Sequence, residues 1–362
     1  MSKRAYNFNP GPAALPLEVL QQAQEEFVDY KGIGMSLMEI SHRSKEYEQI
    51  NAETQELMLD LLGLDSGYQV LFLGGGASTQ FATIPLNFLK PGKVGSYIIT
   101  GSFSDKAYQE GKVVGEAVIA ASNKAEKWRS LPAQSDIQVD PNSAYVHMTT
   151  NNTIEGSQFS YVPDTGNVPL IGDMTSGILS RPIDAKKFAM IYAGAQKNLG
   201  PSGVTVAVIR DDMLTEEPKH IPTMLRYTTH ASNSSLYNTP PVHSIYMMNL
   251  VLKWVKENGG VAAMEQRNME KSKLIYDVID TSGGFYEGNI DPDSRSIMNI
   301  TFRLPSEELE KQFVKESLQQ NFIGLAGHRS VGGIRASAYN AVPYAACKAL
   351  ANFMTYFQKR NG

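Results

Sequence analysis

Cysteine is nearly absent from this sequence, because Cys347 is the single one among 362 residues. No disulfide can form within the chain, which favours a reducing compartment, and we expect the cytoplasm. No stretch of about eighteen apolar residues is present to span a bilayer. The opening residues MSKRAYNFNPGPAALP also lack the apolar core of a signal peptide. These absences argue against a secreted protein and against one that works in a membrane.

Runs of one charge sign are absent as well. The chain has 33 Lys and Arg against 37 Asp and Glu, a formal net charge of −4, with no basic cluster. Nucleic acid and anionic membrane surfaces are therefore poor candidates for partners, and small molecules are better ones. No internal repeat, low-complexity segment or metal-binding motif is visible, and no metal is expected.

Hydrophobic residues, in contrast, are plentiful at 42% of the chain, enough to bury two cores. Periodicity predicts strands at 68–73, 96–100, 145–148, 168–171, 188–193, 204–209, 296–304, 322–325 and 333–337, with helices at 15–30, 46–63, 80–89, 261–281, 306–320 and 343–358. We expect an α/β protein. Its predicted parts are an N-terminal segment (1–15) packing on the small domain, a large domain (16–259) with a mostly parallel sheet, and a small α+β domain (260–362), with a boundary at Gly259-Gly260.

The most informative stretch is KKFAMIYAGAQKNLGPSGVTVAVI, residues 186–209, in which two apolar strands flank Lys197. Small residues on both sides let a flat ligand approach the backbone. A lysine in such a pocket can lose its proton and attack a carbonyl, whereas a surface lysine in an ordinary connection is the bland alternative. Asp173, at the end of an upstream strand, favours the reactive interpretation. Lys and Asp together are what a pyridoxal phosphate site requires.

Other strand ends carry ligand-type residues. The run Gly74 to Thr79 precedes a helix and can cradle a phosphate, although it is neither a Walker loop nor a GxGxxG fingerprint. Phe103 opens another helix and can stack on a flat ligand or serve as core. The polar residues 149–156 either bind a ligand or turn the chain. Because carboxyl ends of parallel strands meet at one edge of a sheet, these residues should converge.

Three further groups are ambiguous by themselves. The dyad His42-Arg43, and likewise His328-Arg329, can clamp an anion or lie in solvent. Asn238 and Thr239 stand before a proline-started helix and could simply cap it. Arg335, on a short strand with small neighbours, is either paired to an acid or reserved for a ligand carboxylate. Cys347 lies in an apolar helical context and is best interpreted as a buried core residue.

Taken together, these motifs closely resemble the phosphoserine aminotransferase family of fold-type I pyridoxal phosphate enzymes, within the class V aminotransferases. The likeness extends from FNPGPAALP through EISHRSKE, FLGGGAS, DMTS, AGAQKNLGPSG and YNTPP to GHRSVGGIRAS and YNAV, essentially the whole chain. It implies a homodimer with shared active sites. It also implies amino transfer from L-glutamate to 3-phosphohydroxypyruvate in serine biosynthesis. Some members also act in pyridoxine biosynthesis on a longer phosphohydroxy keto acid, and the motifs do not separate the two substrates.

The resemblance also assigns roles to single residues. It implies that Lys197 binds the cofactor covalently and carries the reaction's proton, while Asp173 holds the pyridinium, Phe103 stacks on the ring and Thr153 bonds the ring hydroxyl. The cofactor phosphate would be held by Ala77, Ser78 and Gln196, together with Asn238 and Thr239 of the neighbouring subunit. The substrate α-carboxylate would bind Arg335, and the substrate phosphate would bind His42, Arg43, His328 and Arg329.

Two positions depart from the family pattern. Many members have tryptophan where this chain has Phe103, and some have arginine where it has Ala77, so substrate phosphate must rely on the His-Arg pairs. Rival interpretations are an aminotransferase using serine or alanine with glyoxylate, which would have little use for two His-Arg pairs, and a non-catalytic phosphate-binding module. A cysteine desulfurase or lyase is disfavoured by the context of Cys347, and a nucleotide-binding oxidoreductase by the missing glycine fingerprint.

Overall fold

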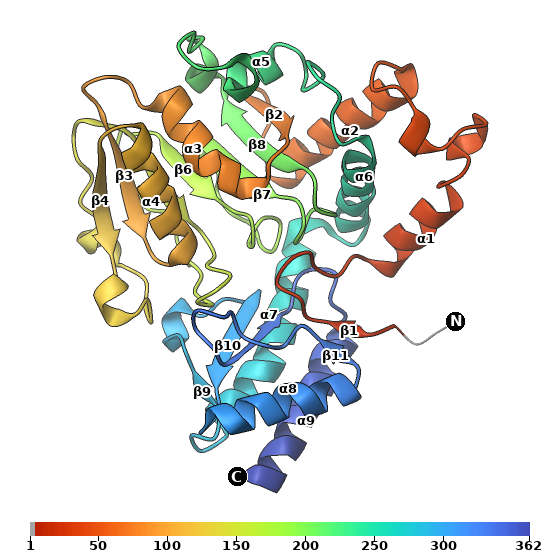
Figure 1. Cartoon of the computed structure of the whole chain (residues 1–362), viewed down its shortest axis with the longest axis vertical. Coiled ribbons are helices and arrows are strands. Elements are labelled where there is room, and N and C mark those ends of the chain that lie inside the picture. The colour runs from red at the N-terminus through yellow and green to blue at the C-terminus, as the bar shows by residue number, and fades with distance from the viewer. Residues whose placement is uncertain (1–3) are drawn as a thin grey trace.

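The computed structural model describes residues 4–362 and is built around a seven-stranded sheet (Figure 1). In spatial order the strands are β2 (Tyr68–Leu73), β8 (Thr205–Arg210), β7 (Met190–Gly194), β6 (Leu170–Asp173), β5 (Ser143–Thr149), β3 (Val94–Ile99) and β4 (Ala117–Ser122). Only β8 runs against the rest, pairing antiparallel with both β2 and β7. The predicted α/β class with a mostly parallel sheet is confirmed.

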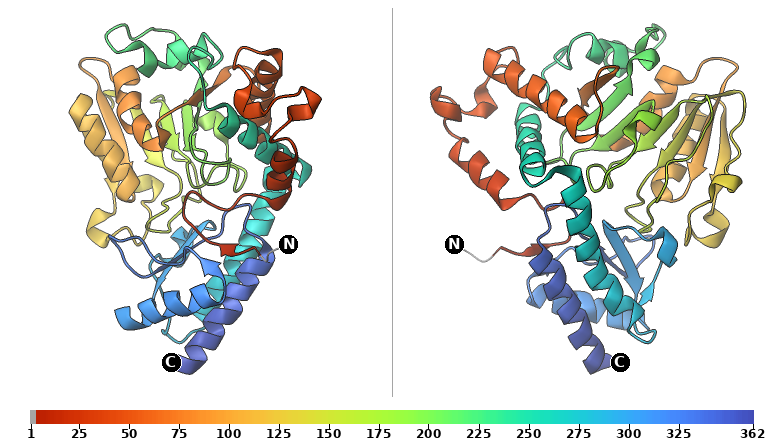
Figure 2. Two further views of the ribbon diagram at one scale, coloured as in Figure 1. Left: turned by 45° about the vertical axis from the view of Figure 1, so that its right-hand side comes forward. Right: turned by 180° about the vertical axis from the view of Figure 1, so that it is seen from behind.

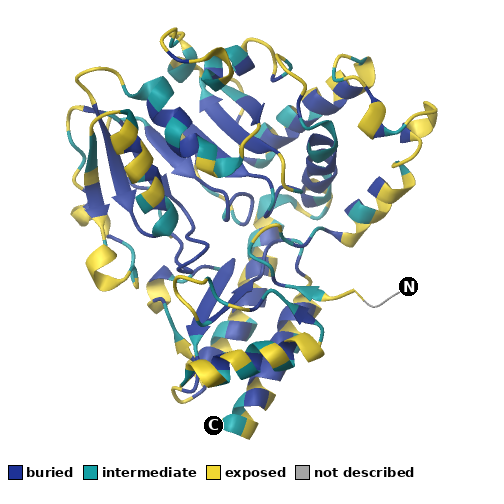
Figure 3. Cartoon of the chain, viewed as in Figure 1, coloured by how far each residue is buried: buried dark blue, intermediate teal, exposed yellow. Residues whose placement is uncertain are grey.

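Helices cover both faces of this sheet, as its almost uncharged strands require. One face packs on α2 (Lys45–Leu61) and α6 (Val242–Glu257). The other packs on α3 (Gly76–Phe88), α4 (Ser102–Val114) and α5 (Tyr227–Ala231). Successive strand residues point to opposite faces, and Figure 3 shows the strands buried between helices that are exposed outward.

The C-terminal part forms its own smaller layer pair below the sheet in Figure 1. Its antiparallel sheet has the order β12 (Ile334–Ser337), β10 (Asn299–Arg303), β9 (Glu287–Gly288). The helices α7 (Gly260–Asp280), α8 (Glu307–Gln319) and α9 (Tyr344–Asn361) enclose a separate hydrophobic core that includes Cys347. The long helix α7 descends from α6 into this part, as the rear view in Figure 2 shows.

The N-terminal segment joins the C-terminal part. Strand β1 (Tyr6–Asn7) pairs in parallel with β11 (Phe322–Ile323), and Phe8 is buried in the core around α9. The chain then passes the carboxyl edge of the large sheet before α1 (Leu17–Glu25). Short 3-10 helices complete the elements, at Tyr30–Gly32, Leu37–Glu39, Lys124–Glu126, Gln134–Asp136, Ala185–Lys187, Asp211–Leu214, Thr223–Leu225 and Pro292–Ser294.

Three local predictions need correction. The helix predicted over 15–30 ends after Glu25, because Asp29 closes a loop by accepting a hydrogen bond from the backbone N–H of Gly34 at 2.8 Å. The helix predicted from 80 begins at Gly76, so only the last of the three glycines lies in its first turn. Strand β4 and helix α5 were not predicted, since three of the six residues of β4 are alanine, which is depleted in strands, and α5 has only five residues. Of the residues described, no helix is long and apolar enough to cross a membrane.

Candidate active site

A cavity of about 270 Å³ lies at the carboxyl ends of the parallel strands, a size at the lower end for small-molecule sites. Its walls come from the large sheet, from the start of α3 and α4, from the N-terminal turn and from the C-terminal part. Nine of the predicted site residues line it: Ala77, Ser78, Phe103, Thr153, Asp173, Gln196, Lys197, His328 and Arg335.

Lys197 lies in the turn between β7 and β8 with its side chain buried at 7% exposure. Its Nζ donates a hydrogen bond to Oγ1 of Thr153 at 2.5 Å. Burial lowers the pKa of Lys197 to about 7; the positive charge of Arg335 adds to this and the Asp173 carboxylate opposes it. A large share of this amine is therefore unprotonated at neutral pH, which is the form that can act as a nucleophile.

The N-terminal turn covers this lysine. Gly11 has a φ of +141°, and a Cβ placed there would lie 3.3 Å from Cε and 3.4 Å from Cγ of Lys197. The backbone N–H of Ala13 donates to the carbonyl of Gln196 at 2.9 Å, and the Tyr339 hydroxyl donates to the carbonyl of Pro10 at 2.8 Å. Only glycine allows the chain to pass so close to the reactive side chain.

Asp173 ends β6 and is buried beside the lysine. Its Oδ1 accepts a hydrogen bond from the backbone N–H of Thr175 at 2.9 Å. Burial raises the pKa of Asp173, while the contacts with Thr175 and the charge of Lys197 work against this rise. A carboxylate held in this way is a partner for a positively charged group inside the cavity.

The start of α3 provides an anion site. Gly75, with a φ of 89°, precedes the helix without a side-chain cap, and Ala77 and Ser78 follow in its first turn. The first backbone N–H groups of a helix have no partner within it and carry partial positive charge. Because both residues line the cavity, these groups favour a bound phosphate there.

Phe103 stands in the first turn of α4 on another wall of the cavity. The Nζ of Lys197 lies 5.8 Å from the centre of its ring, and the Nζ of Lys106 lies 5.3 Å from it. The preceding Ser102 donates from its backbone N–H and from its hydroxyl to Oε1 of Glu155, at 2.8 and 2.6 Å. The ring is thus fixed at the cavity by the end of its helix.

Two basic side chains line the cavity from the C-terminal part, Arg335 and His328. Arg335 on β12 is buried, and its Nη1 donates to the carbonyl of Thr153 at 3.1 Å, while its Nε has no partner. His328 lies in the preceding loop, with Nδ1 2.7 Å from the hydroxyl of Ser330. Burial lowers the pKa of His328, and the charges of Arg335, Lys106 and Arg329 lower it further. An anionic ligand would raise the pKa of His328 again, and it could accept hydrogen bonds from the free N–H groups of Arg335.

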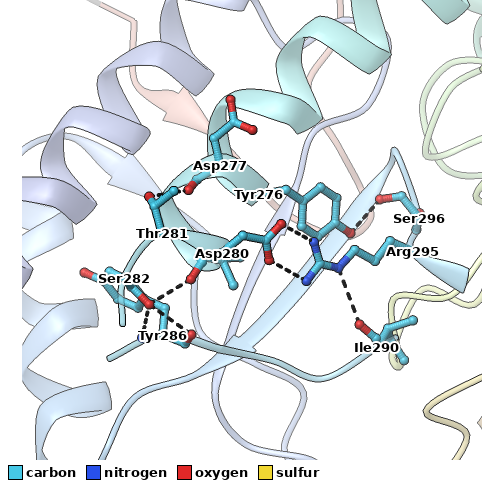
Figure 4. A network of polar contacts seen from close by, with 10 residues as sticks. Tyr276, Asp277, Asp280, Thr281, Ser282, Tyr286, Ile290, Arg295 and Ser296 are labelled. Atoms are coloured by element: carbon cyan, nitrogen blue, oxygen red, sulfur yellow. Dashed lines mark hydrogen bonds and ion pairs between the residues drawn. The ribbon is translucent and has the colours of Figure 1, made fainter. Parts of the chain in front are cut away.

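The loop that carries Thr153 is fixed to the C-terminal part. Thr301 on β10 donates to the carbonyl of Glu155 at 2.6 Å, and Arg295 forms a β-bridge to this loop. Arg295 is itself held by two bonds of 2.7 Å to Asp280 and by the ring of Tyr276 4.6 Å away (Figure 4). These contacts fix the position of Thr153 relative to Arg335.

Five predicted residues lie outside this cavity: His42, Arg43, Asn238, Thr239 and Arg329. His42 and Arg43 are in the turn before α2, and Arg329 is exposed. Asn238 and Thr239 line a second cavity, of about 530 Å³, beside Gly74 and Gly75. They do not cap α6, whose N-cap is Pro241 without a side-chain bond.

Several cavity residues were missed by the sequence interpretation of the site. Gly11 lies in the FNPGPAALP motif and Phe81 closely follows the run Gly74 to Thr79, but neither motif gives these two residues a role in the cavity. Thr175 and Ser176 directly follow the strand that ends at Asp173, so the sequence places them at this strand end without giving either residue a role. Lys106 does not line the cavity, but it lies one helical turn beyond Phe103, a spacing that places both on one face of α4.

Comparisons with known proteins agree with this geometry. The family model for class-V aminotransferases matches residues 5–350. The phosphoserine aminotransferase of Niallia circulans is 61% identical over 362 residues and covers 100% of both chains. The solved phosphoserine aminotransferase of Bacillus circulans subsp. alkalophilus has a TM-score of 0.99 at 61% identity, again over 100% of both chains. The pyridoxal phosphate-bound enzyme of Trichomonas vaginalis has a TM-score of 0.93 at 40% identity, covering 97% of this chain and 100% of that one.

Proposed function

Since this chain belongs to the class-V aminotransferases, and within them to the phosphoserine aminotransferases, we propose that it transfers the amino group of L-glutamate to 3-phosphohydroxypyruvate, giving O-phospho-L-serine and 2-oxoglutarate. The fold and family expected from the sequence are confirmed. The chain is a pyridoxal phosphate-dependent transaminase. The observation that carries the proposed reaction is the buried pair Lys197 and Asp173 in one cavity with Arg335.

The cavity fits pyridoxal 5'-phosphate in the types of groups it offers. An amine with a pKa near 7 suits an aldehyde, a buried carboxylate suits a protonated ring nitrogen, and the start of α3 suits a phosphate. We propose that Lys197, Asp173, Phe103 and Thr153 hold the ring. We propose that Ala77, Ser78 and Gln196 hold the phosphate.

The chemistry is divided between cofactor and chain. Pyridoxal phosphate supplies an aldehyde that takes up amino groups and a ring that accepts an electron pair. Asp173 keeps a positive charge at the ring nitrogen favourable. Once its amine is free, Lys197 moves the proton of the substrate Cα, and its pKa near 7 suits it both to accept and to return that proton.

Substrate recognition is proposed to use two anion subsites. Arg335 is buried, has an unpaired Nε, and presents a planar fork that matches a carboxylate. It would bind the α-carboxylate that both substrates share. His328 and Arg329 would bind the substrate phosphate together with His42 and Arg43, and would bind the side-chain carboxylate of glutamate in the other half of the reaction.

We propose that the active form is a homodimer with shared sites. His42, Arg43, Asn238 and Thr239 lie outside the cavity of their own chain. In addition, apolar side chains are exposed in the segment before α2, with Val28 exposed by 79% and Met38 by 58%, and with Phe27, Ile33 and Met35 as further members. Such a cluster is unusual on a monomer and favours cover by a second copy. It lies at the right of Figure 3.

Mixing two inactive variants tests the sharing. A Lys197→Ala chain and an Arg43→Ala chain are each impaired. If Arg43 serves the partner's site, mixed dimers have one site with both residues intact, about a quarter of all sites after random exchange. Recovered activity supports a shared site, and an unchanged mixture contradicts it for Arg43. Sedimentation velocity gives the oligomeric state independently.

The division of the chain and its compartment are also proposals. Two separate cores support a boundary at Gly259-Gly260, since the residues buried around α9 form their own cluster, which takes in Phe8 from the N-terminal segment. The single Cys347 is buried and unpaired, which suits the reducing cytoplasm.

Loss of the lysine tests the proposed role of Lys197. Lys197→Ala should abolish turnover and leave the cofactor bound only non-covalently, while Lys187→Ala, an exposed position in the same segment, should retain both. Turnover is measured with glutamate and phosphohydroxypyruvate, and covalent attachment by mass spectrometry after borohydride reduction. Normal turnover in Lys197→Ala would contradict the mechanism.

A further inference from the structure

Two buried polar residues lie on the strands that flank Asp173, outside the cavity lining. His147 lies on β5, Asp173 on β6 and Tyr192 on β7, three adjacent strands. Asp173 is paired in register with Tyr192 on one side and with Thr149 on the other, so His147, two residues before Thr149, points to the same face. His147 and Tyr192 are fully buried.

The three side chains form a row, from His147 through Tyr192 to Asp173. Nε2 of His147 lies 2.9 Å from the hydroxyl oxygen of Tyr192. Tyr192 is the strand partner of Asp173 on β7, and its hydroxyl works against the rise that burial imposes on the pKa of Asp173. The Nδ1 of His147 has no partner. Neither His147 nor Tyr192 lines the cavity.

The direction of the hydrogen bonds follows from Asp173. A carboxylate only accepts, so a Tyr192 hydroxyl beside Asp173 can serve it only as a donor, and the Tyr192 oxygen would then accept from Nε2–H of His147. This leaves Nδ1 as a bare acceptor. The alternative would bury an unpaired N–H at Nδ1, which proteins tolerate less well than an unpaired acceptor. Tyr192 remains protonated because burial raises its pKa far above the usual value.

We propose that His147 and Tyr192 are positioning residues for Asp173, forming a fixed donor chain from His147 Nε2–H through the Tyr192 hydroxyl to the carboxylate. The chain would hold Asp173 ionised and aligned for the ring nitrogen. This inference rests on the proposed function of Asp173 and names the residues that support it.

The surroundings keep His147 neutral. Burial lowers its pKa to about 3, and the rings of Tyr97 and Tyr192 lie 5.4 and 5.9 Å from the imidazole. The other titratable groups that influence Asp173 or Tyr192 are Lys197 and the hydroxyls of Tyr97 and Tyr227. Since the imidazole adds no positive charge, the negative charge of Asp173 remains available to the cavity.

The tautomer of His147 is one test. The holoenzyme is labelled with ¹⁵N-histidine, and the His147 signal among the six histidines is identified by its loss in His147→Asn. We expect a neutral imidazole protonated at Nε2, identified by coupling of the protonated nitrogen to both carbon-bound ring protons, and unchanged through the neutral pH range. A proton on Nδ1, or a charged imidazolium, would overturn the proposal.

Removing one hydroxyl is the second test. Tyr192→Phe deletes the donor to Asp173, so Asp173 should take up its proton at a higher pH and cofactor affinity should begin to fall at a higher pH than in the unmodified protein. At neutral pH we expect about tenfold weaker cofactor binding, because a hydrogen bond to a charged group is lost. The readout is the dissociation constant of pyridoxal phosphate across pH, measured on apo-protein.

Tyr97→Phe is the matched control. Its hydroxyl is buried in the same cluster and bonds the Tyr145 hydroxyl at 2.7 Å, but Tyr97 lies on β3, which is not adjacent to the strand of Asp173. Tyr97→Phe should lose a similar amount of stability, but the pH dependence of its pyridoxal phosphate affinity should not shift. Equal profiles in Tyr192→Phe and Tyr97→Phe would overturn the proposal. If the protein binds no cofactor at all, the proposed function fails. The tautomer of His147 would still show whether the donor chain from Nε2–H exists.

Discussion

Replacing Arg335 should weaken both amino donor and amino acceptor by the same factor. The guanidinium is 6% exposed and makes one bond, to the carbonyl of Thr153, so most of its five N–H donors are free for a ligand. Truncating one partner of a buried, hydrogen-bonded charge pair costs about 2–5 kcal/mol. For Arg335→Ala this predicts a fall in kcat/KM of about 30-fold to several thousand-fold.

Two further variants sharpen this prediction. Arg335→Lys keeps the charge but loses the planar fork, so its loss should be intermediate. Arg303→Ala removes an arginine from the neighbouring strand β10 that pairs with Glu310 at 2.6 Å and does not line the cavity. It should retain normal kinetics.

The assay measures each half-reaction separately, with glutamate and with the phosphorylated keto acid. Equal losses in Arg335→Ala are expected, because both substrates present the same α-carboxylate. A loss confined to one substrate would refute the assignment of Arg335 to a shared carboxylate.

Four other outcomes follow from the structure. Lys197 keeps its proton up to about pH 10.5 in the unfolded chain but loses it near pH 7 in the folded one. The free energy of unfolding of the apo-protein should therefore rise with pH between these values. In Lys197→Met this contribution to the rise should be absent, as measured by denaturant titrations. Gly11→Ala should lower cofactor occupancy, measured by absorbance, because a Cβ would press on Lys197. Lys271 is buried and donates to three backbone carbonyls, so Lys271→Met should cost about 2–4 kcal/mol in denaturant titrations. Burial raises the pKa of Cys347 to about 11, so thiol reagents should modify it only upon unfolding, and rapid modification of folded protein would contradict its burial.

Much of the cavity could be predicted because it is built from strand ends. Apolar runs predict strands, and the carboxyl ends of parallel strands meet, so Phe103, Thr153, Asp173 and Lys197 were expected together before any coordinates. The glycine run 74–76 predicted that a helix starts nearby, but it did not predict the first residue of α3. The strand Met190–Gly194 was predicted for the same reason, since it is apolar throughout.

The remaining features depend on long-range packing that no local pattern encodes. Gly11 meets Lys197 only because β1 pairs with β11 and brings the N-terminal turn across the sheet edge. Within apolar strands, His147 and Tyr192 looked like core residues, and their contact needs the spatial order of the sheet. Asn238 and Arg43 lie outside the cavity of their own chain, and the role proposed for them requires a second chain.

In the proposed reaction one cavity accepts both glutamate and phosphoserine as amino donors. A visible absorption spectrum of the purified protein, recorded before and after separate addition of each amino acid, tests it most directly. The purified protein should be yellow, and both amino acids should convert the cofactor to its amine form. A response to glutamate but not to phosphoserine would contradict the phosphate-binding site, and a colourless protein that stays unresponsive after added pyridoxal phosphate would contradict the transaminase itself.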